Sequence, residues 1–471
     1  MSKLKLFLIL ASALLISCNP NPNDPNNGND TGTGGGGTGT GGGNTVGGGY
    51  VLPKGSLSQE EQQKDLNPNN FTTTLFKKND PQIGSKYFRI PALICTEQGT
   101  IIAAADRRYD KTLDLGRGSK IDVIVKRSTD LGKTWENYIL VGPGAKETSG
   151  SDAYGDTFMI NTHSGAIILG VVENPGIQGA ANTILYKSTD DGKTWNKTHT
   201  LAANTFDGAT KGFAASGQGV TLRYGQNANA KRLAFAYYAV GGNGSTTAGN
   251  ANRILLMLSE DDGDNWKVAG GTTTSPLDET KVYELSDGTI MLNHRTSISH
   301  GKRKWSKSTD LGKNWVFSGK DDTEIQDPGC NADLTRYEFD GVPIKDAKYG
   351  LYINCNARAT GGYFDTRKNH YVYLTKSDFK DGNIDSTGKY DYQHQLVNNG
   401  EQMYSGYPTI TVLPDGTIAT LTEETPDKPT GGLTDTYDIV FRRFNLYWLT
   451  GGKEYVDYSK DRRFQTPNKI K

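Results

Sequence analysis

Short segments rich in Ile, Val and Leu recur along most of this chain. Ile121–Lys126 and Arg253–Leu258 are two examples, and turn-forming residues follow each of them. Such segments are typical of β-strands that bury one or both faces. No long helical period appears from Phe71 to Thr450, and a short turn is expected near Ser58–Asp65. The pattern predicts an all-β body over residues 71–450.

An eight-residue pattern, Ser-x-Asp-x-Gly-x-x-Trp, follows four of these segments. The copies are Ser128–Trp135, Ser188–Trp195, Ser259–Trp266 and Ser308–Trp315, and a faint fifth copy at Ser377–Gly382 lacks the Trp. The copies recur at intervals of roughly 50–70 residues, which is typical of β-propeller blades. At this spacing residues 71–450 hold six blades. We therefore predict a six-bladed β-propeller, with little chain left for a second folded domain.

Each copy has the composition of a hairpin turn. Asp accepts hydrogen bonds from backbone N–H groups of its own loop, and Gly supplies a positive φ that other residues resist. Trp can fold back over the turn and bury its ring. The repeated Asp is therefore interpreted as a structural residue and a poor candidate for catalysis.

Composition narrows the range of partners. The 471 residues carry 52 basic and 52 acidic side chains, and this net charge of zero gives no support for nucleic acid as a partner. The six His residues show no metal-ligand pairing, and the four Cys residues show no zinc motif. This disfavours a metal centre, and we expect no cofactor.

The first residues have the features of a targeting segment. Lys3 and Lys5 precede an apolar run over residues 6–16. A basic start and a short apolar run are typical of a secretory signal, and the run is too short for a stable membrane span. The sequence Leu15-Ile16-Ser17-Cys18 resembles the lipobox of bacterial lipoproteins. This resemblance implies that residues 1–18 are a signal peptide and that Cys18 is lipidated.

Residues 19–49 consist almost wholly of Asn, Pro, Asp, Gly and Thr. This composition cannot bury a core, so we expect residues 19–70 to be a disordered tether and lead-in, and 451–471 to be a tail. The tether's r.m.s. reach of roughly 30 Å would hold the body off a membrane. The three other Cys residues leave at most one disulfide within the chain. We expect an exported, membrane-anchored bacterial lipoprotein at the cell surface or in the periplasm.

The segment Tyr87-Phe88-Arg89-Ile90-Pro91, just before the first repeat, matches the FRIP motif of bacterial sialidases. The repeats match the Asp boxes of the same family. Residues 71–450 therefore resemble the bacterial exo-α-sialidase (neuraminidase) family over essentially their whole length. The resemblance implies a sialidase-type six-bladed propeller that removes terminal sialic acid from glycans.

Sialic acid carries a carboxylate on its anomeric carbon. Arg suits this group because its planar fork binds a carboxylate bidentately and stays charged. The family uses three Arg residues from different blades, and its motifs match Arg89, Arg295 and Arg367 in this sequence. The resemblance implies that these three bind the substrate carboxylate. Arg358 is a rival for the third position, because the spacing here departs from the family's usual one.

The substrate carboxylate also restricts the nucleophile. It would repel an attacking Asp or Glu, whereas a neutral Tyr that loses its proton during the attack avoids this clash. Sialidases with a Tyr nucleophile are an established exception among glycoside hydrolases. The strand that begins at Gly406 resembles the family's Tyr strand and implies Tyr407 as nucleophile. Pro408 stands where the family more often has Ser, and Tyr404 is the alternative.

A base and an acid must accompany the nucleophile. The Asp-Glu pair ending at Glu279 matches the family's Asn-Glu pair and implies Glu279 as the base, with Glu284 as the other acidic residue nearby. Asp114 occupies the family's acid/base position between the FRIP motif and the first box, and Asp110 is its alternative. Burial beside apolar groups would be needed to raise the pKa of this acid.

Three further residues complete the set that the resemblance implies. Arg108 and Asp156 resemble family residues near the ring substituents of the sugar, and Glu423 resembles the carboxylate that orients the first Arg. The resemblance as a whole implies a retaining exo-α-sialidase acting on sialylated glycoproteins, glycolipids or oligosaccharides. The alternatives are a trans-sialidase on the same fold, including the intramolecular type, and a non-catalytic glycan-binding propeller. The Tyr–Glu pair argues against the latter, because binding alone does not require it.

Overall fold

A computed structural model describes residues 50–144, 153–174, 179, 181–202, 206–241, 252–272, 277–296, 301–318, 320, 322–345, 347–357, 367–384, 388–398, 404–426 and 436–465. Cys18, the expected signal peptide 1–18 and the tether 19–49 lie outside the described residues, as does Arg358. Most regular structure in the described part is β-strand, grouped into six sheets of four or five strands and two short ribbons.

The six sheets are the blades of a propeller, which confirms the predicted fold class. The first blade contains β2 (Tyr87–Cys95), β3 (Ile101–Arg108), β4 (Ile121–Ser128) and β5 (Ile139–Gly142). The second contains β6 (Tyr154–Asn161), β7 (Ile167–Glu173), β8 (Thr183–Ser188) and β9 (Asn196–Leu201). The third contains β10 (Lys211–Ala214), β12 (Val220–Thr221), β13 (Leu233–Val240), β14 (Asn252–Ser259) and β15 (Lys267–Thr272).

The other three blades follow in chain order. The fourth contains β16 (Leu277–Glu284), β17 (Ile290–Thr296), β19 (Lys304–Ser308) and β20 (Val316–Phe317). The fifth contains β22 (Ala332–Arg336), β25 (Gly350–Ala357), β26 (Arg367–Thr375) and β27 (Tyr392–Gln395). The sixth contains β28 (Ser405–Val412), β29 (Ile418–Glu424), β30 (Asp438–Phe444) and β1 (Thr72–Phe76).

Short elements connect or flank the blades. The strand β11 (Gly217–Gln218) pairs with β6 in parallel, β18 (Gly301–Lys302) pairs with β21 (Gln326–Asp327), and β23 (Glu338–Phe339) pairs with β24 (Val342–Pro343). The helical elements are α1 (Asp378–Gly382), α2 (Leu446–Leu449), α3 (Arg462–Gln465) and the 3₁₀ turns Glu61–Gln63, Pro68–Asn70 and Gly225–Asn227. None of the helices among the described residues is long and apolar enough to cross a membrane.

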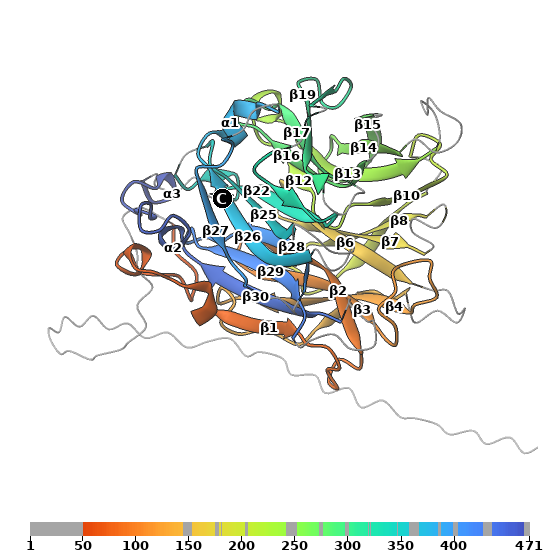
Figure 1. Cartoon of the computed structure of the whole chain (residues 1–471), viewed down its shortest axis with the longest axis horizontal. Helices are drawn as coiled ribbons and strands as arrows, with labels where there is room; N and C mark the ends of the chain where they lie inside the picture. The colour runs from red at the N-terminus through yellow and green to blue at the C-terminus, as the bar shows by residue number, and fades with distance from the viewer. Residues whose placement is uncertain are drawn as a thin grey trace, which may run out of the picture. The chain divides into compact units, whose positions relative to one another are not determined.

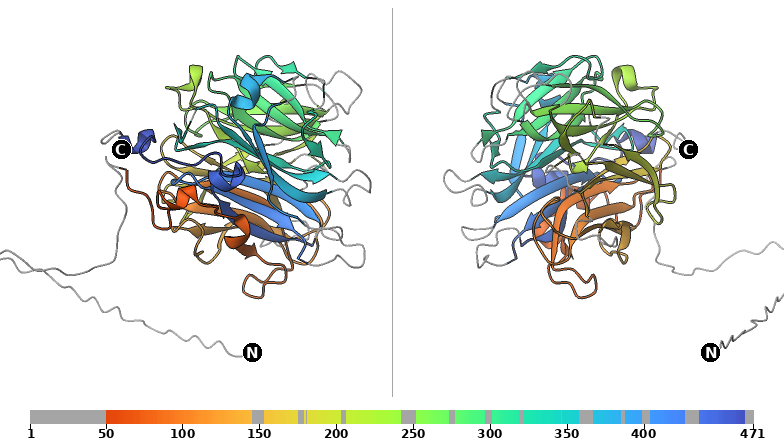
Figure 2. Two further views of the ribbon diagram at one scale, coloured as in Figure 1. Left: turned by 60° about the vertical axis from the view of Figure 1, so that its left-hand side comes forward. Right: turned by 90° about the vertical axis from the view of Figure 1, so that its right-hand side faces the viewer.

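The first strands of the blades meet around a common centre. The strand β2 contacts both β6 and β28, and β22 contacts both β16 and β28. The ring closes because β1, from the N-terminal part of the chain, pairs with β30 as the outermost strand of the sixth blade. Figure 1 shows β1 in orange-red beside β30 in blue, and Figure 2 shows the same two parts of the chain together from two further sides.

The four Asp boxes are hairpin turns, as predicted, and each joins the last two strands of one of the first four blades. In the second box, Ser188 Oγ donates to Asp190 Oδ1 over 2.8 Å, and the backbone N–H of Thr194 donates to the same oxygen over 2.9 Å. The Thr194 hydroxyl donates to Asp190 Oδ2 over 2.6 Å. Trp195 Nε1 donates to the carbonyl oxygen of Gly192 over 3.1 Å. All of these bonds lie within the turn, so the repeated Asp is a structural residue.

The glycine of each box also lets the turn lie against the preceding blade. Gly192 has a φ of +77°, and a Cβ atom at this position would lie 2.4 Å from Ile102 Cδ1 of the first blade. Gly132, with a φ of +88°, would meet the ring of Phe441 in the sixth blade at the same distance. Both the positive φ and the close approach require glycine. The boxes therefore join neighbouring blades as well as closing hairpins.

We expect Asp190→Ala to destabilise the fold without impairing chemistry. The substitution removes three local hydrogen bonds, which should lower the free energy of unfolding by about 1–3 kcal/mol. Chemical denaturation measures this change, and Thr189→Ala, an exposed neighbour in the same box, is the matched control. Loss of turnover by Asp190→Ala at an unchanged melting temperature would contradict the structural role.

The packed body extends beyond the predicted limits of residues 71 and 450. The side chain of Gln62 is fully buried and donates to the carbonyl oxygen of Asp415 over 2.7 Å, and Arg443 donates to that of Gly55 over 3.0 Å. At the other end, Tyr458 and Phe464 are buried. The sequence-based boundaries were too narrow because these flanking segments attach through specific hydrogen bonds and single aromatic rings, which hydropathy does not reveal.

Candidate active site

β-Bulges mark the starts of four inner strands, and candidate residues lie at all four. The ladder shifts register between Arg89 and Ala92 in β2, Gly155 and Phe158 in β6, Leu277 and Thr280 in β16, and Ser405 and Pro408 in β28. A bulge inserts one extra residue and re-aims a side chain. Arg89, Asp156, Glu279 and Tyr407 lie in or beside these bulges, at the same end of their strands.

Three guanidinium groups surround Tyr407. Arg295 Nη1 donates to Tyr407 Oη over 2.9 Å, and the guanidinium carbons of Arg89 and Arg367 each lie 5.7 Å from the centre of the Tyr407 ring. These side chains are buried. The structure thus brings together the three Arg residues predicted from the sequence, although they come from three different blades. Such a concentration of positive charge favours an anion.

Glu423 holds the first Arg and the tyrosine strand together. Its Oε1 accepts from Arg89 Nε over 2.8 Å and from the backbone N–H of Ile90 over 2.7 Å, and its Oε2 accepts from the backbone N–H of Tyr407 over 2.8 Å. A Cβ atom on Gly406 would lie 2.1 Å from Glu423 Oε2, so the close approach needs glycine there. The predicted contact with Arg89 is present, and the two backbone contacts are additional.

Glu279 and Tyr407 both contact Arg295. Arg295 Nη1 is ion-paired with Glu279 Oε2 and hydrogen-bonded to Tyr407 Oη. Burial and the Glu279 charge raise the pKa of Tyr407 well above its ordinary value, despite the opposing effect of Arg295 and Arg367. The phenol is therefore protonated at neutral pH, and its use as a nucleophile requires a base beside it.

A buried loop supports the third Arg. Arg367 Nη2 donates to the carbonyl oxygen of Gly329 over 2.7 Å. Asp327 Oδ1 accepts from the N–H of Gly329 over 2.9 Å, and Asp327 Oδ2 lies 3.2 Å from Arg303 Nη1. Arg303 also donates to the carbonyl oxygen of Cys330 over 3.0 Å. No local sequence pattern pointed to Arg303 or Asp327, because their partners are distant in sequence and their burial is not visible in a polar segment.

Asp114 is exposed and lies beside Arg108. Its side chain is 56% exposed, and its Oδ1 accepts from Arg108 Nη1 over 2.9 Å. Desolvation raises the pKa of Asp114, but the charges of Arg108 and Arg89 outweigh it and lower the value to about 2. The free protein therefore lacks the burial beside apolar groups that would be needed to raise this pKa. Asp110, the alternative, is also exposed.

Arg108 and Asp156 border this acid. Arg108 is buried, and its Nη2 lies 3.1 Å from Asp106 Oδ2. Asp156 is half-buried and adopts a positive φ of 53°, which is uncommon for a residue other than glycine. Burial, together with the charges of Asp106 and Asp114, raises the pKa of Asp156 well above its ordinary value. Asp106 begins the Asp-Arg-Arg segment that ends at Arg108, and sequence reasoning assigned no role to its buried carboxylate.

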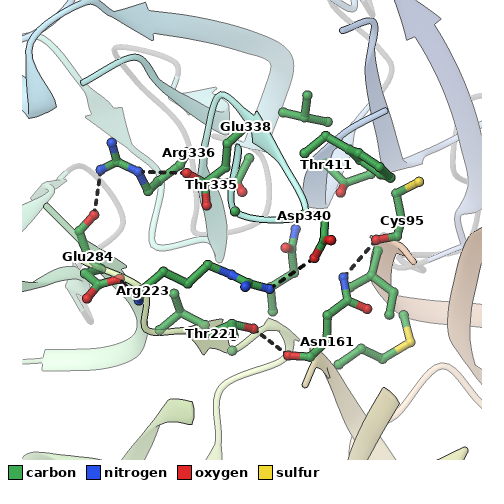
Figure 3. A pocket seen from close by; sticks show the side chains of 18 of the residues that line it. Cys95, Asn161, Thr221, Arg223, Glu284, Thr335, Arg336, Glu338, Asp340 and Thr411 are labelled. Carbon is green, nitrogen blue, oxygen red and sulfur yellow. Dashed lines mark hydrogen bonds and ion pairs between the residues drawn. The ribbon is translucent and has the colours of Figure 1, made fainter. Parts of the chain in front are cut away.

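The alternative residues occupy other places. Glu284 lies at the opposite end of β16 from Glu279, where it accepts from the backbone N–H groups of Arg223 and Tyr224. It lines a cavity of about 130 Å³ formed by the far ends of the inner strands, in which Arg223 extends toward Asp340 (Figure 3). This position separates Glu284 from Tyr407. Tyr404 is half-buried just before β28, and the centre of its ring lies 4.4 Å from Lys368 Nζ.

Comparison with known proteins identifies similar chains. The model of the BNR repeat-like domain family matches residues 90–350. A curated sialidase of Micromonospora viridifaciens is 31% identical over 383 residues, which cover 78% of this chain and 53% of that protein. A curated sialidase of Bacteroides fragilis is 28% identical over 378 residues, which cover 76% of this chain and 63% of that protein. The chain thus spans between half and two thirds of the length of these two relatives.

Solved structures share the same fold. The intramolecular trans-sialidase from Ruminococcus gnavus aligns with a TM-score of 0.63 at 19% identity, covering 82% of this chain and 99% of that chain. A Hadza microbial sialidase aligns with a TM-score of 0.62 at 23% identity, covering 78% of this chain and 67% of that chain. At these identities the likeness shows the fold alone.

Proposed function

Because the chain belongs to the sialidase family of BNR-repeat proteins, we propose that it is a retaining exo-α-sialidase that hydrolyses terminal sialic acid from glycoconjugates. The observation that carries this proposal is the convergence of Arg89, Arg295 and Arg367 on Tyr407. Three guanidinium groups around one phenol suit a substrate whose reacting carbon bears a carboxylate. A glycan-binding propeller has no need of a phenol paired with a carboxylate at this place.

The residues divide the proposed reaction into two steps. Tyr407 Oη attacks the anomeric carbon while Glu279 accepts its proton, and the bond to the leaving glycan breaks as Asp114 protonates the departing oxygen. Water then attacks the same carbon after giving a proton to Asp114, and Tyr407 leaves and regains its proton from Glu279. Two displacements at one carbon retain its configuration. The high pKa of Tyr407 supports a mechanism in which deprotonation accompanies attack.

Asp114 must gain a proton before it can act as an acid, and we expect substrate binding to cause this. In the free protein the Arg108 and Arg89 charges lower its pKa to about 2. A bound carboxylate would neutralise Arg89, and the glycan would exclude water, so both effects raise the pKa of Asp114. The complex should therefore bind more protons than the free protein, and a carboxylate-bearing inhibitor should bind more tightly as the pH falls from 7 to 5.

Calorimetry in buffers of different ionisation enthalpy measures this proton uptake. The uptake should disappear in Asp114→Asn, whose amide cannot be protonated in this range. Asp110→Asn is the matched control from the same loop and should retain it. Binding without proton uptake at pH 5 would contradict the proposed acid.

Turnover of a fluorogenic sialoside by the full chain tests the function itself. We expect release of the fluorophore together with free α-sialic acid as the first product seen by NMR, before mutarotation. Release of the β-anomer would contradict the retaining mechanism. A 2,7-anhydro product would instead assign an intramolecular trans-sialidase, and binding without turnover would assign a glycan-binding propeller.

The membrane anchor is a separate proposal. A lipidated Cys18, joined to the body through the Asn-, Gly- and Thr-rich residues 19–49, would hold the body near a membrane. We expect Cys18→Ser to move the protein from the membrane fraction to the soluble fraction while activity per molecule persists. Fractionation by flotation, with Cys95→Ser as control, measures this. A Cys18→Ser protein that still floats with membranes would contradict the anchor.

A further inference from the structure

Two cysteine side chains, Cys330 and Cys355, belong to the same buried cluster as Tyr407. Cys355 lies in β25, and Cys330 lies two residues before β22, whose Ala332 pairs with Asn354. Both thiols are buried, with exposed fractions of 0% and 2%, and they belong to one small buried cluster. Both are reduced in this structure. The antiparallel pairing of β22 with β25 therefore brings Cys330 near Cys355 at the same end of the two strands.

The cysteine pair is part of the candidate site. Cys330, Cys355, Ile90 and Tyr407 form one buried apolar cluster. Cys330 directly follows Gly329, whose carbonyl oxygen accepts from Arg367 Nη2 over 2.7 Å. Any displacement of Cys330 therefore changes both the packing under the phenol and the support of the third Arg.

The two thiols are not equivalent. Burial opposes ionisation of Cys330, but the hydrogen bond from Cys355 and the charge of Arg367 outweigh it, so the pKa of Cys330 is lowered. Burial and its role as donor raise the pKa of Cys355. A thiol of lowered pKa beside a second thiol is the arrangement of an attacking and a resolving cysteine.

We propose that Cys330 and Cys355 are a redox modification site that forms a reversible disulfide beneath Tyr407. With a small disulfide as oxidant, the Cys330 thiolate attacks one of its sulfur atoms and releases one thiol. Cys355 loses its proton, attacks Cys330 in the mixed disulfide and releases the second thiol. The protein gives up two electrons and two protons, and the oxidant becomes two thiols. An exported protein meets such oxidants, because compartments outside the cytosol are oxidising.

Oxidation changes the candidate substrate site through the Gly329–Cys330 segment, which supports Arg367. A disulfide brings the sulfur atoms to about 2.05 Å, closer than any hydrogen bond between them. This movement draws the Gly329–Cys330 segment toward β25 and changes the support of Arg367. The reduced form is therefore the form that binds the substrate carboxylate well, and oxidation weakens binding. This consequence rests on the proposed function, whereas formation of the disulfide does not.

Mass spectrometry of the full chain tests the bond. The protein is treated with the thiol oxidant diamide or with oxidised glutathione, unreacted thiols are alkylated under denaturing conditions, and the digest is analysed without reductant. We expect a cross-linked peptide pair containing Cys330 and Cys355, lost on reduction with dithiothreitol. Cys95 is the internal control, because burial raises the pKa of its thiol and it should remain alkylatable. Recovery of alkylated Cys330 and Cys355 after oxidation would overturn the proposal.

Binding of 2,3-didehydro-2-deoxy-N-acetylneuraminic acid tests the consequence. We expect oxidation to weaken its affinity about tenfold or more, as when one bidentate charge contact is disturbed, and dithiothreitol to restore it. Cys355→Ala should show no further loss of affinity when oxidant is added, and Cys95→Ser should respond to oxidant as the wild type does. A cross-link that leaves affinity unchanged would overturn the regulatory consequence.

If Cys355→Ala does not fold, the reversible response of the wild type decides. Failure of reduced wild type to bind would count against the proposed function, and the cross-link would still be judged separately.

Discussion

Replacing Tyr407 with Phe should lower the turnover of a sialoside by about three orders of magnitude or more. The substitution removes one oxygen atom and almost no volume, so the ring still packs in its buried cluster with Cys330 and Cys355. Arg295 keeps its ion pair with Glu279 after the phenol oxygen is lost. Inhibitor affinity should therefore remain within about twofold of wild type, and the loss should appear in kcat.

A fluorinated sialoside that traps the covalent intermediate identifies the nucleophile. It should label wild type at Tyr407 and leave Tyr407→Phe unlabelled. Tyr404→Phe is the matched control, because Tyr404 lies three residues earlier, just before β28, and was the alternative from the sequence. Label on Tyr404, or near-normal turnover by Tyr407→Phe, would show that the wrong tyrosine was chosen.

The fold was predictable because its repeated signal is local. Every hydrogen bond of Asp190 described here has its donor within four residues, so the turn can be recognised from eight consecutive residues. The repeat length then fixed the number of blades. The closing pair of β1 and β30 carries no such signal, since it joins positions separated by almost the whole chain.

The site was predictable only through family resemblance. Arg89, Arg295 and Arg367 come from three blades, and no local pattern states that they converge. The family resemblance identified the candidate residues, but it did not predict which side chains surround them. The pKa of Asp114 depends on whether apolar groups or Arg108 lie beside its carboxyl, and this three-dimensional arrangement is not visible in the sequence.

Glu423 shows how a buried charge can organise such a site. Burying a carboxylate is costly unless its oxygens are satisfied, and here one guanidinium and two backbone N–H groups satisfy them. The same contacts fix Arg89 relative to Tyr407 across two blades. For the proposed reaction, this arrangement exists before substrate binds, which would lower the free energy spent on ordering the site.

Replacing Arg367 with Lys should lower kcat/KM by about 10²-fold, mainly by raising KM. The guanidinium can hold the carbonyl oxygen of Gly329 with one nitrogen and still offer others to a carboxylate, because its donors form a planar fork. An ammonium group at this position is shorter and cannot make a bidentate contact. Because Lys keeps the positive charge, the lower kcat/KM would result from the lost bidentate contact geometry. Steady-state kinetics with a fluorogenic sialoside measures both constants.

Arg358→Lys is the comparison that decides the third carboxylate-binding residue. If Arg367 has this role, Arg358→Lys should change kcat/KM by no more than about twofold, the usual effect of a conservative change away from a site. The opposite pattern would assign the role to Arg358. Small changes in kcat/KM for both variants would contradict a third bidentate Arg altogether. Loss of such a contact to a desolvated carboxylate must lower kcat/KM measurably. The position of Arg367, 5.7 Å from the Tyr407 ring and supported by the buried Arg303–Asp327 pair, favours the first outcome.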